Sequence, residues 1–404
     1  MSFEKILLTI ASLLGLVMLV YSLYYIFIGI HYNKYRRDYP ETNNLNKFAI
    51  LIAARNEEAV IGELVASLQE QKYPKDKYDI YVLPNNCNDD TKGAAERAGA
   101  LIFEPPLPVK SKGKVLHQTI DYLMRTSDHD AYIVFDADNI VDVNFICEMN
   151  KALEAGYGAA AGFRDSKNPY STYMSSSYSL FYLVTNVFYN GARSALGMNS
   201  LITGTGFMIS REKLKKLGGW NTVTITEDVE LTLQLSNMGE EIAYVPKAIT
   251  YDEQPEDFEQ SWHQRLRWSI GSQQNYKLMG HKLFNSAVNK EGKNAFDMFL
   301  MLTATYMQIF GFIAGAVGLF AMFILNFKGF ILSVILGSLG LAIVQGLLGI
   351  ITLKHLGKPI APMWKGIIFI WWFTLSWLPI HIIALFKDDI EWKEIEHKST
   401  EEII

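Results

Sequence analysis

The chain has 404 residues, a formal net charge of −5 and a hydrophobic content of 50%. This length is enough for one sizeable globular domain together with membrane segments. The slight acidic excess argues against nucleic acid as a partner, because nucleic-acid-binding chains carry a surplus of Lys and Arg. The two cysteines, Cys87 and Cys147, are far apart and suggest neither a disulfide framework nor a zinc site.

Four long stretches of the chain carry no charged side chain: residues 6–30, 298–327, 329–353 and 366–386. Each can supply the roughly 20 helical residues that cross a hydrocarbon core of about 30 Å. The part between them has the composition of an ordinary globular domain. The sequence therefore predicts a transmembrane anchor in residues 1–33, a globular domain in 34–260, a membrane-interface segment in 261–297, about three transmembrane helices in 298–387 and a polar tail in 388–404.

The charges beside the first apolar stretch predict the side of the membrane on which the domain lies. The stretch exceeds the about 7–15 apolar residues of a signal peptide, and no small-residue cleavage site follows it, so an uncleaved anchor is expected. Lys34, Arg36 and Arg37 follow it, whereas Lys5 alone precedes it. The positive-inside rule then predicts a multi-pass protein of the cell membrane with a cytoplasmic domain.

Short apolar stretches alternate with helical patterns through the first half of the domain. Strands are predicted at residues 47–54, 78–83, 101–103 and 131–135, and helices at 57–72, 91–99 and 114–125. This alternation predicts an α/β domain with a parallel, doubly wound sheet. Further patterns predict helices at 181–194 and 261–278, strands at 207–210 and 242–245, and a helix that starts at Glu227 with Thr226 as its N-cap.

Polar residues follow three of these predicted strands. Asn56 and Glu57 follow the first, residues 85–90 follow the second, and Asp136 and Asp138 follow the fourth. In a doubly wound sheet, ligands bind outside the carboxyl ends of the strands. One nucleotide could therefore contact all three groups.

Asp136 and Asp138 lie two residues apart at the end of a buried strand. Two carboxylates there are hard to accommodate without a cation. Mg²⁺ or Mn²⁺ bridging to a diphosphate would satisfy both, because hard cations prefer oxygen ligands and retain substrate phosphates. An isolated Asp-x-Asp pair is more often a loop or a cap, and the later motifs are what favour the metal.

Glu227 and Asp228 open a predicted helix. Acidic residues are common there because helix-terminal N–H groups and the helix dipole stabilise them. The functional alternative makes Asp228 a general base that removes the proton of an acceptor hydroxyl as it attacks a sugar carbon. Its position between the Asp-x-Asp pair and a downstream Gln-x-x-Arg-Trp motif favours this alternative.

The sharpest motif is Gln264, Arg267 and Trp268, which share one face of a helix. A Trp face can stack on a sugar ring, and an Arg fork suits diphosphate oxygens. The alternative is an interfacial helix, where Trp and Arg are common, and Trp262, His263 and Arg265 are assigned to that role. Lys112 lies in a Lys-rich loop before a helix. It is either a solvent-exposed basic residue or a ligand of the diphosphate.

These motifs together resemble the membrane-embedded family 2 glycosyltransferases, the group with cellulose, hyaluronan and poly-N-acetylglucosamine synthases. The matching stretches are AARNEE (53–58), NNCNDDT (85–91), SKGKVLHQ (111–118), VFDADN (134–139), GTGFMI (204–209), GGWN…TED (218–228) and QRLRW (264–268). The apolar stretches before and after the domain also fit this group.

The resemblance implies a GT-A fold, Rossmann-like in character, and an inverting displacement at a nucleotide-activated sugar. Donor contacts are implied for seven residues: Asn56, Glu57, Asn85, Asp89, Lys112, Asp136 and Asp138. Asp138, with Asp136, would hold Mg²⁺ or Mn²⁺, and Asp228 would be the base, with Glu227 beside it in the catalytic group. The acceptor and diphosphate site would be formed by Gln264, Arg267, Trp268, Gly204, Thr205 and Gly206.

The chain departs from the family pattern at Asn85, where an Asp usually contacts the nucleotide base. An Asn can still hydrogen-bond a uracil imide, but without charge. UDP-glucose and UDP-N-acetylglucosamine are the commonest donors of the family. Asn85 puts the identity of the base, or the affinity for it, in question.

Three functions are compatible with these observations. The first is a polysaccharide synthase that extends a β-linked polymer and passes it through its own membrane helices, and a possible accessory membrane subunit belongs to this hypothesis. The second is a transferase that adds one or a few sugars to a membrane lipid, favoured by the small number of membrane segments. The third, an inactive partner or transporter-like scaffold, is disfavoured because the apolar stretches contain no charged residue apart from the titratable His381.

The C-terminal topology is open at this level. Four spans would place the C-terminus opposite the domain, yet the tail that begins DDIEWKEIEH at residue 388 resembles tails that are cytoplasmic in relatives. Either residues 298–327 contain an interfacial helix, or Pro379 breaks the last apolar stretch so that its end lies in the membrane interface.

Overall fold

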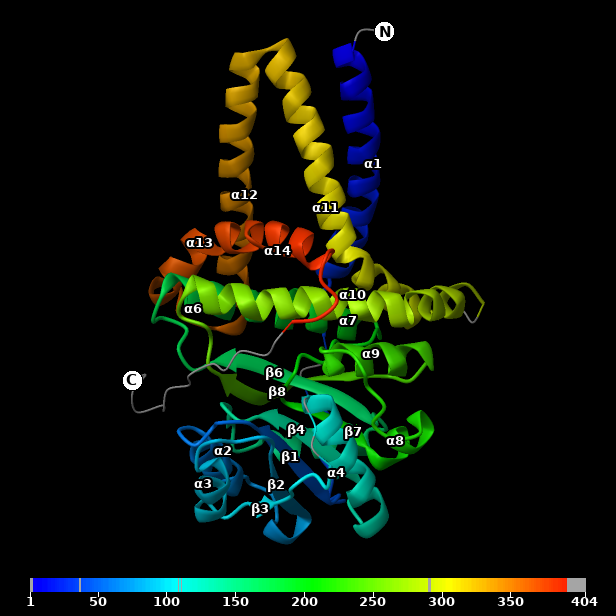
Figure 1. The fold of residues 1–404 in the computed structure, drawn as a ribbon, viewed down its shortest axis with the longest axis vertical. Coiled ribbons are helices and arrows are strands. Elements are labelled where there is room, and N and C mark those ends of the chain that lie inside the picture. The colour runs from blue at the N-terminus through cyan, green and yellow to red at the C-terminus, as the bar shows by residue number, and fades with distance from the viewer. Residues whose placement is uncertain (1–2, 36–37, 108, 110, 290–291, 391–404) are drawn as a thin grey trace.

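Three layers succeed one another along the molecule: a sheet domain, a layer of crosswise helices, and three long helices that project away from both (Figure 1). The computed structural model describes residues 3–35, 38–107, 109, 111–289 and 292–390. Arg36, Arg37 and the part of the tail from residue 391 onward therefore lie outside the described residues, as do Pro108 and Lys110.

The sheet has eight strands in the order β3-β2-β1-β4-β7-β6-β8-β5. Their bounds are β1 Phe48–Ala54, β2 Tyr78–Pro84, β3 Leu101–Ile102, β4 Ala131–Asp136, β5 Ile140–Val141, β6 Ala159–Ser166, β7 Phe207–Ser210 and β8 Ala243–Asp252. Strands β1 to β4 run parallel, as predicted, whereas β7 is antiparallel to both β4 and β6 and β5 is antiparallel to β8. Strands β6 and β8 are parallel to each other, so the parallel sheet predicted from the first four strands continues into a mixed second half.

Helices cover both faces of the sheet because successive strand residues point to opposite sides. In β1, Phe48, Ile50 and Ile52 face a core with α2 (Ile61–Gln69), α3 (Thr91–Arg97) and α5 (Phe145–Glu154). Ala49 and Leu51 face a second core with α4 (Lys112–Thr126), α8 (Arg211–Leu217) and α9 (Glu227–Asn237). Strands β1 and β4 are thus buried on both sides, as their continuous apolar sequences require.

Helix α2 begins at Ile61 and not at residue 57 as predicted, because the backbone at Asn56 is not helical and Glu57 bonds to Thr91. Asn56 has a φ of 57°, in the left-handed region, and the Glu57 N–H donates to Thr91 Oγ1 at 2.8 Å. Strand β6 was not predicted at all. Its sequence AAAGFRDS has no β-branched residue, so its pairing with β7 and β8, and not local propensity, makes it a strand.

The crosswise layer consists of α6 (Tyr173–Val184), α10 (Phe258–Asn289), α13 (Trp364–Leu375) and α14 (Trp377–Ala384) (Figure 1). Helix α6 continues through a π-helical turn, Thr185–Gly191, into α7, Ala192–Ala195. Buried side chains of α13 pack on α6, and those of α14 pack on α10. The layer is therefore joined by apolar contacts along its length.

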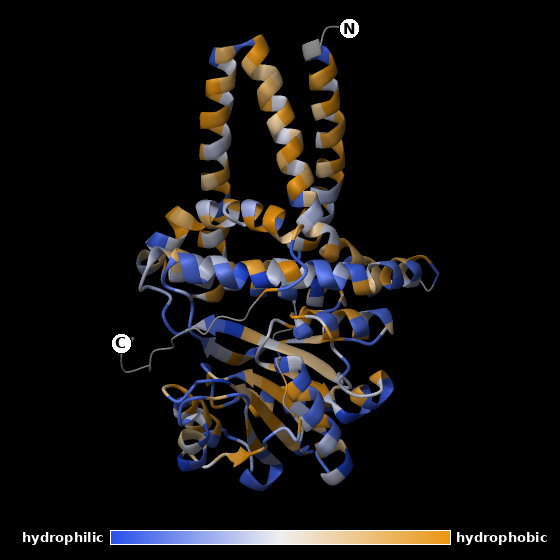
Figure 2. Ribbon diagram, in the orientation of Figure 1, coloured by the Kyte–Doolittle hydropathy of each residue, from blue (hydrophilic) through white to orange (hydrophobic). Residues whose placement is uncertain are grey.

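The three projecting helices are α1 (Phe3–Gly29), α11 (Lys293–Leu325) and α12 (Phe327–Leu356), and they are predominantly hydrophobic (Figure 2). The Tyr24 hydroxyl donates to Asp297 Oδ1 at 2.9 Å, which ties α1 to the base of α11. After α12 the chain returns to the sheet domain, where Lys358 pairs with Asp165 of β6 at 2.6 Å. Helices α11 and α12 thus form a hairpin with both ends at the crosswise layer.

Four segments are long and apolar enough to cross a membrane, including residues 361–384. This last one is not a single straight helix: a 3-10 turn, Ala361–Met363, leads into α13, and α13 is separated from α14 at Ser376. Pro379 accounts for the separation, since it lacks the N–H that would bond to Leu375 in a continuous helix. The α13–α14 pair lies across the three projecting helices instead of alongside them (Figure 1).

Candidate active site

Five elements bring the predicted site residues to one edge of the sheet. Asp136 ends β4, Lys112 begins α4, Glu227 begins α9, and Gly204 lies in the loop before β7. Helix α10 passes over this edge with the Gln264 motif. The carboxyl ends of parallel strands thus collect residues that are far apart in sequence, as expected for a ligand site.

Lys112 is the centre of the charged cluster. Its Nζ lies 2.5 Å from Asp136 Oδ1 and 3.7 Å from Glu227 Oε1, and it donates to the Gly204 carbonyl at 2.8 Å. Burial alone would raise the pKa of Asp136, but the charges of Lys112, Arg164 and Arg267 outweigh it, and the pKa lies below its ordinary value. The role of Lys112 as a solvated loop residue is therefore wrong: it is engaged with the site carboxylates.

Glu227 and Asp228 form a second acidic pair across from Asp136. The Glu227 side chain is only 12% exposed. Burial raises its pKa to about 7, against the opposing effect of Lys112 and with a further increase from Asp228. Burial also raises the pKa of Asp228, while a hydrogen bond from the Val229 N–H opposes the change. A proton acceptor with a raised pKa is suited to general base catalysis near neutral pH.

Gly204 separates the two acidic groups. Its φ is 81°, and a Cβ at this position would lie 3.6 Å from Asp136 Oδ2 and 3.8 Å from Asp228 Oδ2. Glycine therefore leaves open the space between the donor carboxylate and the candidate base. Thr205 and Gly206, predicted beside it in the acceptor pocket, are buried behind the site.

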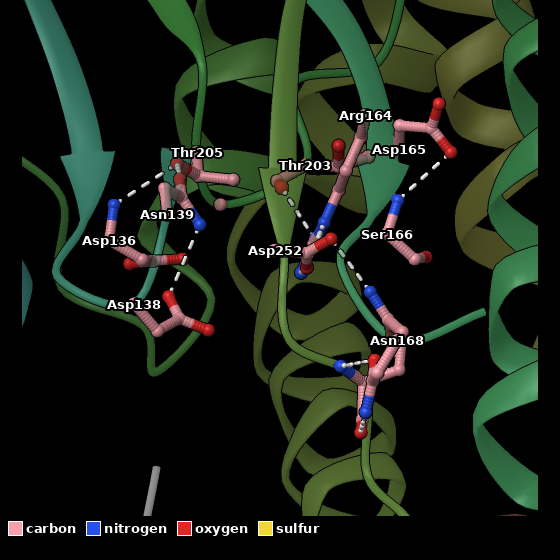
Figure 3. A network of polar contacts seen from close by, with 12 residues as sticks. Asp136, Asp138, Asn139, Arg164, Asp165, Ser166, Asn168, Thr203, Thr205 and Asp252 are labelled. Carbon is pink, nitrogen blue, oxygen red and sulfur yellow. Dashed lines mark hydrogen bonds and ion pairs between the residues drawn. The ribbon is translucent and has the colours of Figure 1, made fainter. Parts of the chain in front are cut away.

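Thr205 organises the Asp-x-Asp turn. Its hydroxyl accepts from the Asp136 N–H at 3.0 Å and donates to Asn139 Oδ1, while the Asn139 amide donates to Asp138 at 3.2 Å (Figure 3). Gly206 donates to the Val134 carbonyl at 2.9 Å. Thr205 thus shapes the turn through its side chain and Gly206 through its backbone, and their assignment to the acceptor pocket stays a prediction.

Asp136 and Asp138 suit a cation that arrives with its own phosphate ligands. Within the described residues, no third His, Cys, Asp or Glu completes a protein-only cation site. Mg²⁺ and Mn²⁺ commonly take one or two carboxylates and complete their shell with substrate phosphates and water. The Asp136 side chain is 36% exposed, so a ligand can reach it. The pair therefore fits a metal-diphosphate complex.

The predicted nucleotide contacts lie together at the ends of β1 and β2. Asn56 Oδ1 accepts from the Asn88 N–H at 2.7 Å, and the Asn85 N–H donates to the Ala54 carbonyl at 2.9 Å. Asp89 accepts from the N–H of Glu58 at 3.0 Å and from the Thr91 hydroxyl. Burial would raise the pKa of Asp89, but these hydrogen bonds outweigh it and lower the pKa. Asp89 thus joins the two loops that would enclose a base.

The acceptor motif lies on α10, where Trp268 packs against α6 and α14. Gln264 Oε1 is buried and has no hydrogen-bond partner among the described residues. The Trp268 ring lies in an aromatic cluster, with centroids 6.1 Å from Tyr178 and 6.0 Å from Trp377. Arg265, assigned to a membrane-interface role, is instead fully buried and donates to the Phe373 carbonyl at 3.1 Å and to Ser376 Oγ at 2.6 Å. It therefore holds the end of α13.

Two site residues were missed by sequence reasoning, Arg164 of β6 and Asp252 of β8. The guanidinium pairs with the Asp252 carboxylate, with Nε at 2.7 Å, and donates to the Thr203 carbonyl at 2.9 Å (Figure 3). Burial raises the pKa of Asp252 to about 6, against the effect of Arg164. Arg164 also lies 4.1 Å over the Tyr182 ring, next to Trp268. No local pattern marks either residue. The segment that forms β6 has no strand pattern, and Asp252 lies beyond the strand predicted at 242–245.

The donor edge, the acidic pair and the aromatic platform are the parts that a sugar transferase needs. Residues 46–271 match the glycosyltransferase like family 2. This segment makes up more than half of the chain and contains every predicted site residue, so the chain belongs to this family. The family resemblance and the α/β GT-A-like fold are thereby confirmed, and the protein is an enzyme of the glycosyltransferase class.

Relatives extend the similarity beyond the catalytic domain. The chain is 28% identical to a probable glycosyltransferase of Bacillus subtilis, over 95% of this chain and 96% of the relative. It is 25% identical to a β-monoglucosyldiacylglycerol synthase of Trichormus variabilis, over 64% of this chain and 55% of the relative. It is 24% identical to a poly-β-1,6-N-acetyl-D-glucosamine synthase of Staphylococcus aureus, over 67% and 66% respectively.

A solved structure has the same arrangement over nearly the whole chain. It is the mannosyltransferase PcManGT from Pyrobaculum calidifontis in complex with GDP-Man and Mn²⁺, with a TM-score of 0.63 and 17% identity. The match covers 91% of this chain and 99% of that one. It supports the fold of both the sheet domain and the helices that follow.

Proposed function

We propose that the protein is an inverting glycosyltransferase that transfers a sugar from a nucleotide sugar to an acceptor held at the membrane surface. The observation that carries this proposal is the Gly204 gap between two acidic pairs. Asp136, of the first pair, lies on one side of it, and Asp228, of the second pair, lies on the other. A sugar carbon in this gap would have its leaving group at the first pair and its attacking hydroxyl at the second.

The donor is held from the strand ends. Asn56, Glu57 and Asn85 surround the base and ribose, and Lys112 with Arg267 provides positive charge for the diphosphate. Asp138 and Asp136 would hold Mg²⁺ or Mn²⁺, which would neutralise the charge that develops on the nucleotide diphosphate. We propose a UDP-sugar, because the Asn85 amide can pair with the uracil imide.

The transfer is a single displacement with one proton shift. The acceptor oxygen bonds to the sugar C1 as the bond from C1 to the diphosphate oxygen breaks, and the nucleoside diphosphate leaves with the bonding electrons. Asp228 takes the proton of the acceptor hydroxyl. Because the acceptor attacks from the face opposite the leaving group, the configuration at C1 inverts and an α-linked donor yields a β-linked product.

We further propose that the protein spans the membrane three times, with the catalytic domain in the cytoplasm. The support is geometric: α1, α11 and α12 project together, and the loop after α12 returns to the sheet domain through Lys358 and Asp165. The α13–α14 pair then lies in the membrane interface, which suits its tryptophans. The described chain accordingly ends on the side of the catalytic domain.

The crosswise α13–α14 pair favours a lipid-linked acceptor with one or a few added sugars. The ring of Trp377 in α14 lies against Trp268, with centroids 6.0 Å apart, and α14 lies on the side of α10 toward the projecting helices (Figure 1). The acceptor then approaches from the membrane interface and not along the axis between the spans. Three spans also offer little enclosure for a polymer.

A polysaccharide synthase is the second candidate. The intact Gln264, Arg267 and Trp268 motif and the relation to the poly-N-acetylglucosamine synthase favour it. An accessory membrane subunit remains a prediction attached to that candidate.

Product analysis with purified full-length protein in nanodiscs separates these functions. UDP-glucose, UDP-N-acetylglucosamine and GDP-mannose would be supplied in radiolabelled form with Mn²⁺, with and without diacylglycerol lipids. A short product that extracts into organic solvent supports the lipid acceptor, whereas a high-mass aqueous product supports the synthase. Absence of transfer from every donor, under conditions where donor binding is detected by calorimetry, would contradict the proposed function.

A further inference from the structure

The loop that precedes α9 is held by α10, seven residues beyond the Trp268 platform. Asn275 Nδ2 donates to Thr226 Oγ1 at 2.9 Å, and both side chains are buried. Gln274 Oε1 accepts from the Ile225 N–H at 2.9 Å. Glu227 and Asp228 directly follow Thr226, so these two hydrogen bonds hold the residues that come just before the candidate base.

Gly271 allows α10 to touch Thr226 with its backbone. A Cβ at Gly271 would lie 3.0 Å from Thr226 Cβ and closer still to the hydroxyl and methyl groups of that side chain. No larger residue fits there unless the loop or the helix moves. The close approach thus depends on the absence of a side chain at this one position.

Thr226 does not cap its own helix. It occupies the N-cap position of α9, as predicted, but makes no side-chain capping hydrogen bond. A Thr at this position ordinarily bonds to an N–H of the first helical turn. Here its hydroxyl accepts from Asn275, so a contact with α10 takes the place of the usual local bond.

The platform and the loop contacts lie on one face of α10. Trp268, Gly271 and Asn275 follow Gln264 by four, seven and eleven residues, which is the repeat of a single helical stripe. Trp268 and Asn275 are therefore about 10 Å apart along the axis, at about 1.5 Å per residue. One continuous helix connects the acceptor platform to the residues that hold the base-bearing loop.

The chain that leaves α14 reaches the same place. Gln274 Nε2 donates to the Asp388 carbonyl at 2.8 Å, and Lys277 pairs with the Asp388 carboxylate at 2.7 Å. Ile390 and Ile225 both pack against the cluster that contains Leu266 and Ile270. The Gln274 amide therefore links the base-bearing loop to the segment that follows the interfacial helices.

We propose that Thr226, Gly271 and Asn275 are positioning residues that set the distance between the base Asp228 and the Trp268 acceptor platform, with Gln274 coupling them to the segment after α14. The inference rests on the proposed function, because it takes Asp228 as the base. None of these four residues contacts the reacting atoms. They act by fixing where Asp228 lies relative to a hydroxyl bound on Trp268.

The test compares Thr226→Val with Thr226→Ser in full-length protein. Valine removes the acceptor oxygen at nearly constant volume, whereas serine retains it. We expect Thr226→Val to lower kcat by about tenfold to a hundredfold, because a misplaced catalytic group costs on this scale. The donor KM should be unchanged, and Thr226→Ser should restore most of kcat.

The ratio of sugar transfer to donor hydrolysis gives a readout that loss of stability would not change. In donor hydrolysis the attacking group is water, which does not need to bind on the Trp268 platform. A displaced Asp228 therefore impairs sugar transfer to the acceptor more than it impairs hydrolysis of the donor. Asn275→Ala should lower this ratio as Thr226→Val does, and it decides the question if Thr226→Val does not fold. Asn285→Ala, on the exposed side of the same helix, is the matched control and should leave the ratio unchanged.

Asp228→Asn distinguishes an error in the positioning role from an error in the assignment of the base. If it abolishes transfer while Thr226→Val and Asn275→Ala keep the normal kcat and the normal ratio, the positioning role is wrong and the proposed function stands. If Asp228→Asn retains full transfer, the base is misassigned and the positioning role fails with it, while the proposed transfer of sugar stands. The proposed function fails if the native protein transfers sugar from none of the donors tested.

Discussion

The proposed donor side and the proposed acceptor side of the site are built on different physical principles. On the donor side, charges are paired in advance: Lys112 with Asp136, and Arg164 with Asp252. On the acceptor side, the Trp268 ring lies among aromatic rings, and the neighbouring Gln264 has a buried oxygen that no described residue bonds. The donor side is thus organised for a charged ligand, the acceptor side for the shape and face of a sugar.

This contrast predicts that charge substitutions act mainly through the donor and the proton transfer, and that aromatic substitutions act through the acceptor. Lys112 is the exception that connects the two, since it contacts both Asp136 and Glu227. The following experiments test where the division lies.

The largest expected effect comes from Asp228→Asn. This substitution keeps the shape of the side chain and removes the proton acceptor, so kcat should fall by about a hundredfold to ten-thousandfold. Radiolabel transfer under saturating donor measures it, and donor binding by calorimetry should be little changed. Asp121→Asn, an exposed Asp on α4, is the matched control with expected normal activity. Normal transfer by Asp228→Asn would assign the base elsewhere.

The next effect is on the proposed metal. Asp138→Asn removes one negative ligand at the strand end, and the donor KM at fixed Mn²⁺ should rise by about tenfold or more, equivalent to about 1.4 kcal/mol. A titration with Mn²⁺ should show weaker half-saturation in the variant than in the native protein. Chelation by EDTA should abolish activity, and Mn²⁺ should restore it. Activity in EDTA equal to that with Mn²⁺ would exclude a required metal.

The two halves of the fold differed in how well the sequence predicted them. Strands β1, β2 and β4 were predicted nearly to the residue because their apolar runs are local and end in Asn56, Asn85 and Asp136. Strand β6 was missed because an Ala-rich segment becomes a strand only by pairing with β7 and β8. Arg164, which β6 places in the site, was missed with it.

The same difference between local sequence patterns and contacts between distant residues applies to the site. Gln264 and Trp268 were recognised because their spacing on one helix carries the motif. Asp252 and Asn275 act through partners far away in the chain, and nothing in their immediate sequence shows this. The crosswise position of α13 and α14 was considered only as an alternative through Pro379, since composition alone describes the segment as a fourth span.

A smaller effect is expected on the acceptor side, from Trp268→Ala. Loss of the ring should lower kcat/KM for the acceptor by about tenfold, because aromatic contacts contribute about 0.5–1.5 kcal/mol beyond burial. The donor KM should be unchanged, and Trp268→Phe should retain most of the activity. Trp364→Ala, at an exposed position on α13, is the matched control. A large rise in donor KM for Trp268→Ala would break the division between the two sides.

The smallest expected effect is a shift in pH dependence, and it tests the connection through Lys112. Burial raises the pKa of Glu227 to about 7 and also raises the pKa of Asp228. The base is active when deprotonated, so kcat/KM should rise with pH through an acid limb well above the ordinary range of a carboxyl group. Lys112 lowers both pKa values, so Lys112→Met should move this limb to higher pH.

The same shift has the opposite consequence for stability. A carboxyl group with a raised pKa in the folded state binds its proton more tightly than in the unfolded chain, so its contribution to stability is complete below about pH 4 and is lost as the pH rises through about 7. Glu227→Gln removes the ionisable group and should therefore raise the Tm at pH 8 relative to the native protein, with little change at pH 5. Two results together would show that Lys112 acts on the donor side alone. The acid limb would stay at the same pH in Lys112→Met, and the difference in Tm between Glu227→Gln and the native protein would not depend on pH.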